Sequence, residues 1–167
     1  VDFAARGGGG VGGSPAAALV LGNDGNFYGT TEFDGATDSG TVFKITPAGV
    51  ATRLIEFTGL VGPNLGRSPQ AALVQGSDGN FYGTTEFGGA DDGGTVFKIT
   101  PEGVLTTLVE FGNSENEDYG YSPTAALVQG SDGNFYGTTA EGGATNHGTV
   151  FSMTPAGVLT TLVQFTG

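Results

Sequence analysis

The sequence predicts an all-β protein made of tandem four-stranded antiparallel blades, similar to those of a β-propeller. Three observations support this fold. One pattern recurs at a fixed spacing, each copy holds four short strand-like segments, and Gly makes up 33 of the 167 residues, which favours tight turns. The recurring residues Phe27, Phe81 and Phe135 lie 54 positions apart, each within the stretch NFYGTT. No segment shows a convincing helical period of apolar residues.

The repeats follow one another without insertions. The segment VDF at the start of the chain is in register with the segments that begin at Ile55, Val109 and Val163. We expect residues 1–13 to hold the end of a preceding repeat and a Gly-rich linker. The predicted blades are residues 14–67, 68–121 and 122–167. Such units are stable because each buries its faces against its neighbours.

The second repeat shows the four predicted strands in chain order. They are AALVQG (71–76), NFYGTTE (80–86), GTVFKIT (94–100) and VLTTLVEF (104–111). Asp78 and Gly79 lie between the first two strands, and Gly supplies the positive φ that a tight hairpin needs. Pro101 and Gly103 suit a turn between the last two strands. Both connections are therefore predicted to be tight hairpins.

Blades that pack face to face need apolar residues on both faces. In the third strand, alternation places Phe97 and Ile99 on one face and Val96 on the other. In the last strand, it places Leu105, Val109 and Phe111 opposite Val104 and Leu108. The glycines of FYGTT are expected to allow close approach of a neighbouring backbone; they are Gly29, Gly83 and Gly137. A stacked β-solenoid is the alternative architecture, although its coils are usually shorter.

Composition excludes several classes of function. The chain carries a formal net charge of −12, from 5 Lys and Arg against 17 Asp and Glu. Because nucleic-acid binding requires a basic surface, nucleic acid is not expected as a partner. The chain has no Cys, which removes disulfides and thiolate metal sites. No apolar run approaches the roughly 18 residues that span a membrane, so no membrane span is expected.

The repeat pattern SP.AALV.G.DGNFYGTT..GGA...GTVFK.TP.GV.TTLV.F resembles the GloVer-type extracellular tandem repeat of secreted bacterial proteins. The resemblance covers practically the whole chain. It implies a propeller-like fold, export from the cell and a role at or outside the cell surface, and it implies no particular catalytic residue. The departures are small: Phe33-Asp34-Gly35 replaces a Gly-Gly pair, and Ser152-Met153 replaces Lys-Ile.

The segments that differ between repeats are expected at one end of the blades, because antiparallel strands place alternate connections at opposite ends. We expect any ligand to be recognised at this variable end. The carboxylates of this end could bind Ca²⁺, which takes about six to eight oxygen ligands. The candidates are Asp34, Asp38, Asp91, Asp92, Glu115, Glu117 and Asp118. The alternative is a solvated acidic rim, since no stretch has the D-x-D-x-D-G spacing. No other cofactor is expected.

Other polar and aromatic residues have structural explanations. Turn formation accounts for the Asp that precedes Gly in each repeat, at Asp24, Asp78 and Asp132. The strand tyrosines could stack on sugars, but packing between blades is the more frequent role; they are Tyr28, Tyr82 and Tyr136. A Ser-His-Asp triad would have to use His147, the only His, and no zinc-ligand set or phosphate-binding loop occurs. We therefore expect no enzyme activity.

The segment VDF is surplus, because the third repeat already holds its own fourth strand, and three blades are fewer than the roughly four to eight of a closed propeller. The sequence favours a non-enzymatic extracellular structural protein that self-associates into a ring or filament, although a longer array would also use this strand. One chain's strand could add to another's sheet. The assembly candidates are Val1, Asp2, Phe3, Val163 and Phe165. The alternative is a cell-surface module that binds carbohydrate or protein at the variable end.

Overall fold

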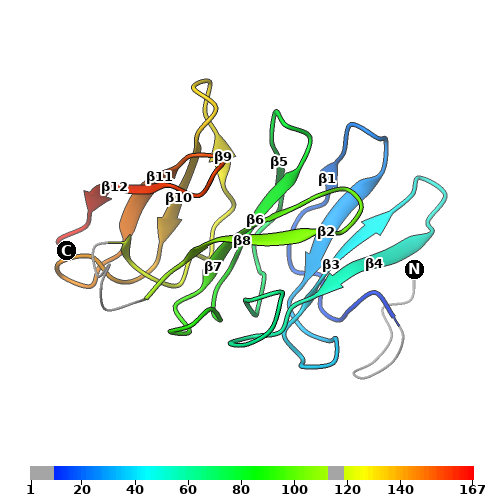
Figure 1. Ribbon diagram of the computed structural model, residues 1–167, viewed down its shortest axis with the longest axis horizontal. Helices are drawn as coiled ribbons and strands as arrows, with labels where there is room; N and C mark the ends of the chain where they lie inside the picture. Colours follow the sequence, from blue (N-terminus) through cyan, green and yellow to red (C-terminus); the bar gives the residue numbers. More distant parts are fainter. Residues whose placement is uncertain (1–9, 113–118) are drawn as a thin grey trace.

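The computed structural model describes residues 10–112 and 119–167, which form three four-stranded antiparallel sheets standing side by side (Figure 1). We name these sheets blade 1, blade 2 and blade 3 in chain order. Blade 1 contains β1 (Val20–Leu21), β2 (Phe27–Thr31), β3 (Thr41–Ile45) and β4 (Ala51–Glu56). Blade 2 contains β5 (Val74–Gln75), β6 (Phe81–Thr85), β7 (Thr95–Ile99) and β8 (Leu105–Glu110). Blade 3 contains β9 (Val128–Gln129), β10 (Phe135–Thr139), β11 (Thr149–Met153) and β12 (Leu159–Gln164).

The strands of each blade pair in chain order, which confirms the predicted all-β, propeller-like fold. The short turns gather at one end of the blades, and the longer loops lie at the other (Figure 1). In blade 2 the N–H of Gly79 donates to the carbonyl of Gly76, and the N–H of Gly103 donates to that of Thr100, both at 2.9 Å. We name this the turn end and the opposite one the loop end. No described residue belongs to a helix long and apolar enough to cross a membrane.

The first strand of each blade is shorter than predicted. In blade 2 only Val74 and Gln75 pair with β6, whereas AALVQG had suggested six residues. Ser68 has a left-handed φ of 54°, which turns the chain at the start of the segment. The carbonyl of Ala71 accepts a hydrogen bond from Thr30 Oγ1 of blade 1 at 3.3 Å. This segment therefore bonds the neighbouring blade instead of extending its own sheet.

A β-bulge in the last strand pair corrects the predicted faces. The pairing of β7 with β8 shifts between Val96 and Phe97, so that Val96 pairs with Val109 and Phe97 with Thr107. The bulge breaks strict alternation. Leu105 therefore faces blade 1, while Leu108 and Val109 face blade 3. The prediction that Leu105 shares a face with Val109 and Phe111, opposite Leu108, was wrong for this reason.

Two apolar junctions join the blades, and each combines the same two types of face. The face toward the next blade, which we name the trailing face, carries Tyr28, Val42, Ile55 and Phe57 in blade 1. The face toward the preceding blade, the leading face, carries Leu73, Phe81, Phe97 and Ile99 in blade 2. The second junction repeats this arrangement, with Tyr82, Val96, Val109 and Phe111 against Leu127, Phe135, Phe151 and Met153.

The strand tyrosines belong to these junctions. Tyr28 stacks on Phe81 of the next blade with ring centroids 4.0 Å apart, and Tyr82 stacks on Phe135 at 3.9 Å. Offset aromatic pairs of this kind contribute about 0.5–1.5 kcal/mol beyond their buried area. The expectation that these two tyrosines pack between blades is confirmed.

The glycine within β6 makes room for side chains of its own blade. A Cβ on Gly83 would lie 2.6 Å from Cζ of Phe97 and 2.8 Å from Cδ2 of Leu73. We had expected a neighbouring backbone to approach at this position. The close approach comes instead from the ring of Phe97, which belongs to the junction with blade 1.

Candidate functional site

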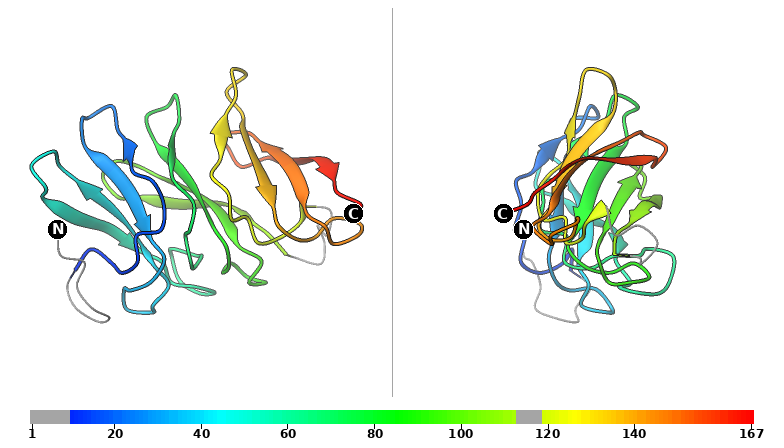
Figure 2. Two further views of the ribbon diagram at one scale, coloured as in Figure 1. Left: turned by 180° about the vertical axis from the view of Figure 1, so that it is seen from behind. Right: turned by 90° about the vertical axis from the view of Figure 1, so that its left-hand side faces the viewer.

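The two outermost blade faces repeat the residue types of the junctions and are partly exposed. At one end of the row of blades (Figure 2), the N-terminal outer face is the leading face of blade 1, with Leu19, Phe27 and Ile45. Leu19 is 50% exposed, whereas its counterpart Leu73 is 3% exposed. Since the residue type and repeat position are the same, the difference arises only from the neighbouring blade.

The C-terminal outer face lies at the opposite end of the row (Figure 2) and is the trailing face of blade 3. Its residues are Tyr136, Val150, Val163 and Phe165. Phe165 is 47% exposed, and its counterpart Phe111 is 0% exposed. The assembly candidates Val163 and Phe165 thus lie on an open apolar face, while Val1, Asp2 and Phe3 fall outside the described residues.

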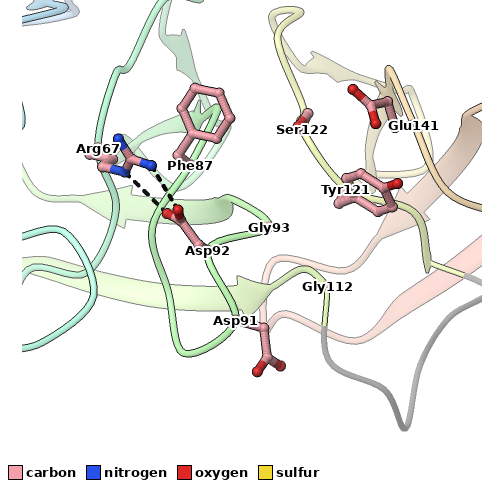
Figure 3. Close-up of a pocket in the computed structure, with 9 residues that line it drawn as sticks. All are labelled: Arg67, Phe87, Asp91, Asp92, Gly93, Gly112, Tyr121, Ser122 and Glu141. Carbon is pink, nitrogen blue, oxygen red and sulfur yellow. Dashed lines mark hydrogen bonds and ion pairs between the residues drawn. The ribbon is translucent and has the colours of Figure 1, made fainter.

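A pocket of about 410 Å³ opens at the loop end between blades 2 and 3 (Figure 3). Blade 2 contributes Arg67, Phe87 and Asp92 to one side, and Tyr121 and Glu141 of blade 3 lie across from them (Figure 3). The remaining lining residues are Asp91, Gly93, Gly112 and Ser122. A pocket of this size falls in the range of small-ligand sites.

An ion pair fixes the side chains on the blade 2 side of the pocket. Arg67 Nε donates to Asp92 Oδ1 at 3.1 Å and Nη2 donates to Oδ2 at 2.7 Å, which is a bidentate ion pair. The hydrogen bonds from Arg67 lower the pKa of Asp92, although burial opposes the shift. The guanidinium also lies over the ring of Phe87, with Cζ 4.7 Å from the centroid. Arg67 is therefore fixed between a carboxylate and an aromatic face.

The blade 3 side is held by hydrogen bonds. Tyr121 Oη donates to Asn146 Oδ1 at 2.7 Å, and the backbone N–H of Tyr121 donates to the carbonyl of Glu141 at 2.9 Å. The N–H of Ser122 donates to the carbonyl of Gly93 across the junction at 2.8 Å. Blades 2 and 3 therefore meet directly at the floor of the pocket. The ring of Tyr121 is positioned without a ligand.

Two of the predicted calcium ligands close loops. Asp38 Oδ1 accepts from the N–H of Asp34 at 2.9 Å, and Asp92 Oδ1 accepts from the N–H of Gly88 at 2.7 Å. In blade 3, Asn146 takes the same role, so the position needs a side-chain acceptor and not a charge. Each of these three residues has a positive φ between 54° and 58°. Loop closure therefore explains Asp38 and Asp92 without a metal ion.

The carboxylates do not converge on one point. Asp34 is buried and its Oδ1 accepts from the N–H of Gly35 at 2.8 Å, whereas Asp91 is exposed beside the pocket. Across residues 10–112 and 119–167, no three acidic or His side chains form a group that could hold a metal ion. Glu115, Glu117 and Asp118 lie outside the described residues, and calcium binding there stays a prediction.

The Asp of each turn does more than shape the turn. Asp78 Oδ1 accepts from the N–H of Asn80, and Oδ2 accepts from Asn80 Nδ2 at 2.7 Å and from Tyr82 Oη at 2.9 Å. Burial and this hydrogen bond raise the pKa of Tyr82. The network recurs at Asp24 and Asp132. The sequence analysis explained each Asp by turn formation alone. The recurring DGNFY segment places Tyr four residues after Asp, and this spacing could have indicated the additional Asp–Tyr hydrogen bond.

A second polar group missed in the sequence bridges the first two blades. Gln70 Nε2 donates to Glu32 Oε1 at 3.3 Å and to Glu86 Oε2 at 2.5 Å. Burial raises the pKa of Glu86, and the neighbouring charge of Glu32 adds to the shift. The amide relieves the repulsion between the two carboxylates. This arrangement ties the two blades together just after the ends of β2 and β6.

The isolated histidine takes no part in these groups. His147 is exposed, and its Nδ1 lies 3.2 Å from Thr145 Oγ1 in the same loop.

Comparison with known proteins identifies the family of the repeat. A model of the Gloeobacter/Verrucomicrobia repeat matches residues 2–167. The chain belongs to this repeat family. The resemblance drawn from the repeat pattern is thereby confirmed. No curated protein matches the sequence.

Solved structures share the blade arrangement. Virginiamycin B lyase from Staphylococcus aureus has a TM-score of 0.53 at 19% identity, with 86% of this chain and 39% of that chain covered. A streptogramin B lyase has a TM-score of 0.53 at 16% identity, with 87% of this chain and 39% of that chain covered. At such identities the likeness shows the fold alone, and the neighbours are β-propellers. The chain spans about two fifths of their length.

Proposed function

We propose that this chain is a non-enzymatic structural repeat protein that associates with further copies of itself through its two outer blade faces, outside the cell. One observation carries the proposal: Leu19, Val163 and Phe165 are about half exposed on the outer faces, whereas their counterparts at the internal junctions are buried. Leu19 and Phe165 show the contrast most clearly. Exposed apolar faces of this kind are typical of interaction surfaces.

The two outer faces are complementary and not alike. Within the chain, a trailing face always packs against a leading face. The C-terminal outer face is of the trailing type, and the N-terminal outer face is of the leading type. One copy can therefore dock on the next as blade 2 docks on blade 1. This contact is head to tail, and it gives a ring if the rotation closes and a filament if it does not.

The free energy expected from burying the apolar side chains of the two outer faces suggests a reversible contact. Fully burying a large apolar side chain gains about 1.5–3 kcal/mol, so Leu19, Val163 and Phe165, which are about half exposed, would each gain about 1 kcal/mol. The other outer-face residues are less exposed and add smaller amounts. Association costs about 4–15 kcal/mol. We therefore expect assembly that depends on protein concentration.

Sedimentation velocity over a wide concentration range tests the association. We expect species larger than the monomer to grow with concentration for the unchanged chain, and Phe165→Asp to remain monomeric. Val104→Asp is the matched control, because Val104 is 63% exposed on a hairpin turn away from both outer faces. A chain that stays monomeric at all concentrations would overturn the proposal.

A mixing experiment tests the head-to-tail arrangement. Leu19→Asp damages one outer face and Phe165→Asp damages the other, so neither variant should assemble alone. An equimolar mixture retains one intact face of each type and should form dimers and nothing larger. If the contact joined like faces instead, Leu19→Asp alone would still self-associate through its C-terminal outer face.

The location outside the cell is supported by the resemblance to extracellular repeats. Antibody detection in the culture medium, at the cell surface and in the cell lysate of the source organism would test it. Protein confined to the lysate would contradict this part of the proposal and leave the association unaffected.

A further inference from the structure

We propose that the pocket between blades 2 and 3 binds a neutral, hydroxyl-rich ligand, namely a sugar ring of a saccharide. The inference is independent of the self-association, because the pocket lies at the loop end and not on an outer face (Figure 3). It would give the chain a specific ligand in addition to a structural role.

The pocket lies where the repeats differ most. Arg67 and Tyr121 occupy the same repeat position, and so do Phe87 and Glu141, so the two sides of the pocket present different chemistry. The junction residues, by contrast, keep the same type in every repeat, as Phe27, Phe81 and Phe135 show. Loop residues that diverge around one cavity are typical of a surface that recognises a ligand.

The polar groups of the pocket call for a ligand that both donates and accepts hydrogen bonds. Arg67 can only donate, whereas the carboxylate of Glu141 can only accept. Phosphates and carboxylates offer acceptors alone, and ammonium groups offer donors alone. A hydroxyl does both, and a sugar ring carries several hydroxyls on adjacent atoms. The lining therefore matches a polyhydroxylated ligand better than either type of ion.

The charge of the pocket excludes anionic ligands. Its lining contains one guanidinium and the three carboxylates of Asp91, Asp92 and Glu141, which leaves a local net charge of −2. Arg67 is also already paired with Asp92. An acidic saccharide would meet this net negative charge within a chain of net charge −12. A neutral saccharide would not be repelled.

The aromatic ring of Tyr121 supplies the apolar surface. A sugar ring has one face made of C–H groups, and the face of an aromatic ring carries partial negative charge that attracts them. Tyr121 is held by its hydroxyl on Asn146 and by its backbone bond to Glu141. Because the ring is positioned in advance, ligand binding costs little side-chain entropy.

Protein-observed NMR titration of the full chain tests the inference. The probes are neutral cello-, xylo- and malto-oligosaccharides, with oligogalacturonate as the anionic comparison. We expect at least one neutral series to shift the resonances of Tyr121 and Arg67 in a saturable manner, and oligogalacturonate to shift neither. No saturable shift with any neutral series, or stronger binding of oligogalacturonate, would overturn the proposal.

Two variants and a control assign the binding to the pocket. Tyr121→Ala should weaken the affinity about tenfold or more, as expected for an aromatic anchor. Glu141→Ala changes an exposed side chain and should fold normally, and it should weaken the affinity several-fold. His147→Ala is the matched control at the same end and should leave the affinity unchanged. Unchanged affinity in Glu141→Ala and Tyr121→Ala, with both chains folded, would overturn the assignment.

Discussion

Phe111 and Phe165 occupy the same position in successive repeats, yet the first is buried in the junction between blades 2 and 3 and the second is half exposed on the C-terminal outer face. The residues around them are nearly identical in sequence. At this position burial is therefore decided by whether another blade is present, and not by the local sequence. In repeat architectures the stability resides largely in such contacts between neighbours.

The largest expected effect comes from removing the same side chain at the two positions. Phe111→Ala should lower the free energy of unfolding by about 3–5 kcal/mol, because it leaves a cavity in a closed junction. Phe165→Ala should cost about 1 kcal/mol or less, since much of the ring is already in water. Urea denaturation at a concentration where the chain is monomeric measures both.

The same two variants also test whether the junction between blades 2 and 3 behaves as one unit. Phe111 packs on Phe151 of blade 3 with ring centroids 5.4 Å apart, so its loss should also loosen blade 3. We expect amide hydrogen exchange in β10 and β11 to quicken in Phe111→Ala and to stay unchanged in Phe165→Ala. Equal losses of stability in the two variants would show that the junctions do not stabilise the blades.

An intermediate effect is expected from the strand glycines. Gly83→Ala should cost about 1–3 kcal/mol, because the added methyl would meet the buried ring of Phe97 and the buried Leu73. Gly29→Ala places the same methyl against Phe43 and Leu19 in blade 1. Leu19 lies on the N-terminal outer face and can move into solvent, so the cost should be smaller.

Thermal unfolding of the two alanine variants, compared with the unchanged chain, measures this difference. Both glycines lie in strands and neither has a positive φ, so backbone strain does not contribute to the difference in stability between the two variants. A cost at Gly29 that equals or exceeds the cost at Gly83 would mean that the outer face is as closely packed as the junctions.

The repeat pattern was sufficient to predict the blades, because their determinants are local. Asp-Gly in the first turn and Pro and Gly in the second fix the two hairpins, and alternating residues place Val96 and Phe97 on opposite faces. The short first strand was not predictable from propensity. Its Ala71 carbonyl bonds Thr30 of another blade, a contact that depends on the tertiary structure.

The remaining differences have similar causes. The bulge beside Phe97 shifts every residue before it in β8 to the other face, and no Gly or other local signal marks it. Ser68 precedes Pro69, a context that favours extended backbone. It nevertheless has a left-handed φ, and its carbonyl accepts the N–H of Glu86. Non-local bonding outweighs the local preference at this position.

The variable end was correctly located in the sequence, but the pocket was not foreseen. Arg67 and Asp92 lie 25 positions apart, and Tyr121 comes from the next blade. Acidic residues drew attention as calcium ligands because the sequence shows composition and spacing but not the direction of side chains. The structure shows Asp92 turned back onto Gly88 and Arg67, where it closes a loop and holds one wall of the pocket.

The smallest expected effect is a pH-dependent one at the turn end. Burial raises the pKa of Asp78, but hydrogen bonds from Asn80 and Tyr82 outweigh it, so the pKa lies below its ordinary value. At Asp132, bonds from Tyr136 and Asn134 also lower the pKa. A lowered pKa in the folded state stabilises the fold above the unfolded pKa of about 3.9, and the contribution is lost as the pH falls through the folded value.

Replacing each Asp by Asn removes the charge and keeps the turn. Asp78→Asn should lower the free energy of unfolding by about 1 kcal/mol at neutral pH, since the charged partner of Tyr82 in the junction is lost. Asp132→Asn should cost less, because water competes for the exposed Tyr136. Both differences from the unchanged chain should shrink as the pH falls through the folded pKa of the Asp, and they should vanish once Asp is protonated in either state. A difference that persists under those acidic conditions would place the effect in turn geometry and not in charge.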